Sequence, residues 1–170
     1  MNKNLKTGKR LNLAAGIINI FTGAFSIIYS LILVFITFLI GSLFGEAGVG
    51  GEIIAGTLGL IMIVPVVVYL GIGITLICFG ASNCKGFKHN ESQYVENKRK
   101  YLGFLITEGI FLAILAAIVA IITIFIGLDI VSIVLTAMVA ITFVLRLVAY
   151  IVLKKVEPVK ESDIQQKFEA

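Results

Sequence analysis

The sequence contains few of the residue types that enzyme and metal sites use most. Its 170 residues include one histidine, two cysteines, two prolines and no tryptophan. His89 has no Cys, His or carboxylate at ligand spacing, so the sequence predicts no metal site. Cys78 and Cys84 are too far apart for a CxxC redox motif, and no nucleophile–base pair or paired acidic motif is present. We therefore expect no cofactor, no disulfide and no enzymatic activity.

Charged residues are also scarce, which determines the fold class. Only 14% of residues are charged and 59% are hydrophobic, whereas soluble domains average about 25% charged and about 45–50% apolar. The apolar residues form four runs of membrane-spanning length. The sequence predicts an all-α integral membrane four-helix bundle of two helical hairpins, which forms one membrane domain over residues 1–170. The predicted spans cover residues 11–43, 53–81, 102–128 and 130–153, with a central loop over 82–100 and a tail over 154–170.

The two short loops between the paired spans, residues 44–52 and 127–129, contain no Lys or Arg. Apart from Arg146, all basic residues lie before the first span, in the central loop or in the tail. Because Lys and Arg remain on the cytoplasmic side, we expect both termini, the central loop and the tail to lie in the cytoplasm. The expected location is the plasma membrane of a bacterium. The pI near 9.1 follows from these flanks, so we expect anionic lipid head groups as partners and no nucleic acid.

The first span has a stripe of small and polar residues at steps of three, four or seven, which places them on one helical face. Such a face is expected to pack inward, where helix backbones approach closely and polar side chains find partners. An alternative is that Asn19 and Ser26 line a polar cavity. The stripe comprises Asn12, Gly16, Asn19, Gly23, Ser26, Ser30 and Thr37.

Two opposite charges interrupt the third and fourth spans. Glu108 and Arg146 are nearly equidistant from the turn Gly127-Leu128-Asp129, so an antiparallel hairpin places them at a similar depth. Three alternatives follow: a structural ion pair, independent snorkelling of Arg146, or a substrate or proton site. Thr142 and Tyr150 lie four residues either side of Arg146, within side-chain reach. The candidate intramembrane polar cluster is Asn19, Glu108, Thr142, Arg146 and Tyr150.

The third span also contains a small-residue seam, which predicts close contact with another helix. The small-xxx-small pairs Gly109/Ala113 and Ala116/Ala120 define this seam, and Ala117 belongs to it.

The chain resembles the small uncharacterised four-span membrane proteins of low-GC Gram-positive bacteria. The resemblance rests on the basic start Asn2-Lys3-Asn4-Leu5-Lys6, the glycine-spaced spans (Gly16, Gly23; Gly71, Gly73) and the absence of Trp. It is architectural and implies no functional residues. We expect an accessory or interaction protein that acts within the membrane, with a membrane protein or a second copy as partner. The alternative is a small transporter or channel with a cytoplasm-facing polar pocket around Glu108 and Arg146.

Overall fold

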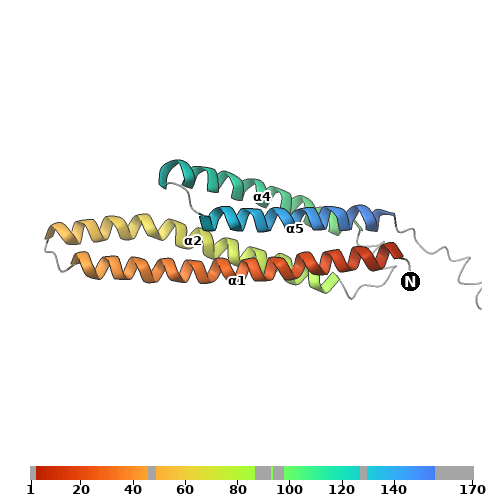
Figure 1. The fold of residues 1–170 in the computed structure, drawn as a ribbon, viewed down its shortest axis with the longest axis horizontal. Coiled ribbons are helices and arrows are strands. Elements are labelled where there is room, and N and C mark those ends of the chain that lie inside the picture. Colours follow the sequence, from red (N-terminus) through yellow and green to blue (C-terminus); the bar gives the residue numbers. More distant parts are fainter. Residues whose placement is uncertain (1–2, 46–48, 87–92, 94–97, 127–129, 156–170) are drawn as a thin grey trace, which may run out of the picture. The chain divides into compact units, whose positions relative to one another are not determined.

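The structure, a computed structural model, is helical throughout the residues it describes, which are 3–45, 49–86, 93, 98–126 and 130–155 (Figure 1). These residues contain no strand. All four long helices have the length and apolar composition needed to cross a membrane. The predicted all-α, four-helix membrane fold is thus confirmed. The helices are α1 (Lys3–Gly45), α2 (Val49–Gly86), α4 (Lys98–Ile126) and α5 (Ile130–Lys154).

Three of the helices extend beyond the predicted spans. Helix α1 begins at Lys3, before the predicted start of the first span at residue 11, and α2 continues to Gly86. Helix α4 begins at Lys98 rather than at residue 102. The physical reason is that Lys and Arg favour helix while opposing membrane insertion, so the hydrophobic run ends before the helix does. The turn predicted at residues 127–129 lies outside the described residues.

The helices differ in length. At 1.5 Å per residue, α1 with its 43 residues is about 65 Å long, and α2 with its 38 residues is about 57 Å. Helices α4 and α5, with 29 and 25 residues, measure about 44 and 38 Å. A bilayer with its head groups is about 40–45 Å thick. Helices α4 and α5 therefore match the membrane, whereas α1 and α2 must tilt or extend beyond it.

The chain divides into two compact units. The first unit combines Met1–Asn19 with Gly80–Ala170, and the second is Ile20–Phe79. The first unit thus contains the start of α1, the end of α2, and both α4 and α5. At the end of this unit that carries the basic residues, Leu5 is buried against Tyr101 of α4 and Leu153 of α5.

The second unit is a pair of helices in backbone contact. A Cβ atom added to Gly23 would lie 2.6 Å from the Gly73 carbonyl oxygen, and one added to Gly73 would lie 2.7 Å from that of Gly23. The Ser26 hydroxyl donates to the Tyr69 carbonyl oxygen at 2.7 Å. The rings of Tyr29 and Tyr69 meet edge to face with centroids 4.9 Å apart. This stripe therefore serves helix packing at Gly23 and Ser26, as predicted.

Helices α4 and α5 pack through the face of α4 that carries Glu108, and of the predicted small-residue seam only Gly109 takes part. Gly109 does lie under the Phe143 ring, since a Cβ added to Gly109 would be 3.1 Å from Phe143 Cε2. The other members of the predicted seam are exposed, so within the described residues they do not make the predicted close helix contact. Burial of Glu108 fixes which side of α4 faces inward, and most of the alanines lie on the far side of the helix. The exposed residues are Ala113, Ala116, Ala117 and Ala120.

Candidate functional site

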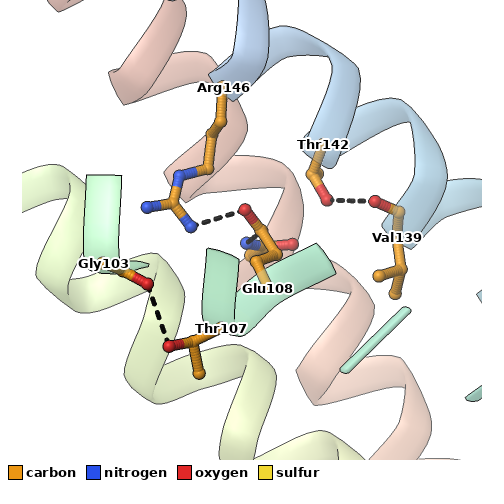
Figure 2. A network of polar contacts seen from close by, with 7 residues as sticks. Gly103, Thr107, Glu108, Val139, Thr142 and Arg146 are labelled. Carbon is orange, nitrogen blue, oxygen red and sulfur yellow. Dashed lines mark hydrogen bonds and ion pairs between the residues drawn. The ribbon is translucent and has the colours of Figure 1, made fainter. Parts of the chain in front are cut away.

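A buried ion pair joins α4 to α5 in the first unit. The Glu108 side chain is fully buried, and Arg146 is 4% exposed. Arg146 Nη1 donates to Glu108 Oε2 at 2.5 Å (Figure 2). A snorkelling arginine would expose its guanidinium at the membrane surface. The structure therefore shows the ion pair rather than independent snorkelling of Arg146.

Helix α1 supplies a second donor to the same carboxylate. Asn19, which is fully buried, donates from Nδ2 to Glu108 Oε1 at 2.9 Å. Both carboxylate oxygens thus accept a hydrogen bond from a different helix. This arrangement ties three helices together at a single side chain, and we call Asn19, Glu108 and Arg146 the polar clamp.

The three members of the polar clamp lie at one depth. Along each helix, the nearest basic residue is eight or nine positions away, which corresponds to about 12–14 Å of helix. These reference residues are Arg10 on α1, Lys100 on α4 and Lys154 on α5. Basic residues mark the membrane boundary, so this spacing places the clamp about 12–14 Å along the helices from that boundary.

Pairing makes this location possible. One charged side chain at the centre of a membrane helix costs about 2.5–3.5 kcal/mol on insertion scales. An ion pair has no net charge, and the Asn19 bond satisfies the second carboxylate oxygen. Removing one partner of such a buried pair typically costs about 3–5 kcal/mol, because the other charge is left alone.

Two of the five predicted cluster residues lie outside the clamp. The Thr142 hydroxyl donates to the Val139 carbonyl oxygen of its own helix at 2.8 Å, as Figure 2 shows. Thr107 similarly donates to Gly103 within α4. In apolar surroundings, the nearest acceptor for a helical threonine is the carbonyl one turn back. Tyr150 is half-buried and has no hydrogen bond or ion pair within the described part of the chain.

A buried amide on α2, Asn83, was not among the residues predicted from the sequence. Asn83 is 7% exposed, and its Cβ lies 3.0 Å from where a Cβ on Gly16 would be. Within the described residues, Asn83 Nδ2 has no hydrogen-bond partner, and neither does Asn19 Oδ1. The sequence did contain a signal for this residue. Asn83 follows Gly80 by three positions, so the two share one face of the helix, and Gly80 faces the α1 stripe.

Other chemistry-bearing residues are dispersed. In the part of the chain that the structure describes, no three His, Cys, Asp or Glu side chains come together as a metal site would require. Cys78 is exposed, and Cys84 is half-buried, with its Sγ 2.9 Å from a hypothetical Cβ on Gly16. Helix packing accounts for the position of Cys84.

Comparison of the chain with protein-family models, with curated proteins and with solved structures finds no match.

Proposed function

We propose that this multi-pass membrane protein is an accessory or interaction protein that acts within the bilayer of a bacterial plasma membrane. The observation that supports this most directly is the state of Glu108. Both of its carboxylate oxygens already accept bonds from Arg146 and Asn19 of the same chain. A carboxylate held in this way stabilises the fold, and a transported substrate would have to displace one of these donors.

The second support is the surface left for a partner. Ala113 and Ala117 are exposed on α4, on the side opposite Glu108. Small side chains let the backbones of two membrane helices approach closely, which is how helices associate in lipid. In the part of the chain that the structure describes, α4 does not use this surface for packing. We therefore propose a membrane helix of another protein as the partner.

The test is purification of the intact chain in mild detergent, together with variants that place a larger side chain on this surface. Ala117→Leu keeps the surface apolar but prevents close approach. Ala137→Leu, at an exposed alanine of α5, is the matched control. We expect a larger membrane protein to co-purify at fixed stoichiometry with the parent chain and with Ala137→Leu, and to be lost with Ala117→Leu.

The transporter alternative gives a different result in the same preparation. It requires a homo-oligomer without a larger partner and, after reconstitution, solute or proton flux that Glu108→Gln abolishes. Flux of that kind would contradict the proposal, since it would show that Glu108 acts on a substrate.

A further inference from the structure

Two buried amide atoms near the polar clamp have no hydrogen-bond partner within the described residues: Asn19 Oδ1 and Asn83 Nδ2. Inside a membrane, such an atom costs several kcal/mol because no lipid group can bond to it. The two atoms are also complementary, since one accepts and the other donates. A small polar ligand that both donates and accepts would satisfy them together.

The orientation of the Asn19 amide is determined by its neighbour. Glu108 Oε1, a carboxylate oxygen, can only accept a hydrogen bond, so Asn19 must present Nδ2 to it. Exchanging the oxygen and nitrogen of this amide would place two acceptors against each other. The Asn19 oxygen therefore points away from the carboxylate, and it is the oxygen, not the nitrogen, that lacks a partner within the described residues.

The buried amides follow one side of α1 towards the end that carries the basic residues, which we call the basic side. Asn12 precedes Gly16 by one helical turn, and Asn19 follows it by nearly one turn. Asn83 packs on Gly16 between them. Successive amides are therefore separated by about 4.5–6 Å along the helix axes, a distance that one or two water molecules can bridge. We call Asn12, Asn83 and Asn19 the amide track; their side chains are at most 7% exposed.

We infer that water from the basic side occupies the amide track and reaches the Glu108–Arg146 pair. Buried water typically makes about three hydrogen bonds to polar groups that lack other partners. Water is both donor and acceptor, so it satisfies Asn19 Oδ1 and Asn83 Nδ2 together. The polar clamp is then in contact with solvent on one side of the membrane only. This inference does not depend on which partner the protein binds.

The first test uses the unaltered chain in lipid bilayers. Solid-state NMR measures how quickly magnetisation passes from water to each amide. The Asn19 and Asn83 side-chain amides are expected to receive it severalfold faster than the backbone amide of Ala149, which is fully buried on α5. Equal rates at all three positions would overturn the inference.

The second test is cysteine labelling with a water-soluble methanethiosulfonate, in a background with Cys78→Ala and Cys84→Ala. Asn83→Cys probes the middle of the track and Asn19→Cys its deep end. Ala149→Cys is the control, because it is fully buried yet only five residues from Lys154. Thiols react as thiolates, which form in water, so we expect both track positions to react about tenfold faster than the control.

Each pattern of labelling decides the question. Reaction at Asn83→Cys alone would show that water stops before it reaches Asn19. Equal reaction at all three positions would show a loosened bundle, and no reaction at any would show a dry track. All three patterns overturn the inference. Only labelling of Asn19→Cys and Asn83→Cys, with Ala149→Cys protected, supports it.

Discussion

Gly16 on α1 and Gly80 on α2 approach so closely that a Cβ on Gly16 would lie 2.9 Å from the Gly80 carbonyl oxygen. The obstacle is backbone, which cannot rotate away as a side chain can. Seven residues further along α1, Gly23 makes the same kind of contact with Gly73. These glycines allow the polar residues of the α1 stripe to approach α2.

Replacing Gly16 with alanine is therefore expected to destabilise the protein. The added methyl group has to displace the α2 backbone, and overpacking of this kind typically costs about 1–3 kcal/mol. Thermal unfolding in detergent, followed by circular dichroism, measures the change. Gly103→Ala on α4 is the matched control, because no atom lies within 4 Å of its hypothetical Cβ. That variant should gain up to about 1 kcal/mol from helix propensity. Equal stability of the two variants would show that the Gly16 contact is unimportant.

Much of the α1 arrangement could be predicted from sequence periodicity alone. Asn12, Asn19 and Ser26 recur at seven-residue steps, so they share one face, and all three are buried. The partner of that face could not be predicted. Whether Asn19 meets Gly-rich α2 or charged α4 depends on how the helices pack, and in the structure its amide reaches Glu108. Helical periodicity identifies a face but not its neighbour.

A double-mutant cycle measures the ion pair. Glu108→Ala and Arg146→Ala should each destabilise the protein by about 3–5 kcal/mol, because each leaves the other charge buried without a partner. The double variant should cost clearly less than the sum, since it leaves no unpaired charge. Unfolding in a denaturing detergent supplies the free energies of unfolding. Additive losses would contradict the pairing.

Asn19 and Thr142 should differ in importance although both are fully buried polar residues. Asn19→Ala removes a donor from a carboxylate, and hydrogen bonds to charged groups contribute about 1.5–3 kcal/mol. Thr142→Val removes only a bond to the carbonyl of its own helix, so we expect a change below about 1 kcal/mol. The same unfolding measurement compares them. A larger loss for Thr142→Val would place Thr142 in the polar clamp.

The polar clamp was only partly accessible to sequence reasoning. The two charges stand out in apolar spans, and counting residues from the hairpin turn placed them at one depth. Asn19 could have been assigned in the same way, since its distance from Arg10 nearly matches that of Glu108 from Lys100. The helical spacing that made Thr142 and Tyr150 candidates was misleading, because the carbonyl oxygen of Val139 competes successfully for the Thr142 hydroxyl.

The orientation of the chain remains a prediction from its basic residues, and reporter fusions test it. A reporter active only outside the cytoplasm should be inactive when fused at Asn90 and active when fused at Gly48. The reason is that Lys and Arg surround the first site and are absent around the second. A cytoplasmic reporter at the same two positions is the control and should give the opposite pattern. Reversed signals at both sites would place the basic side outside. The amide track would then connect the polar clamp to the exterior, and the four helices would be unaffected.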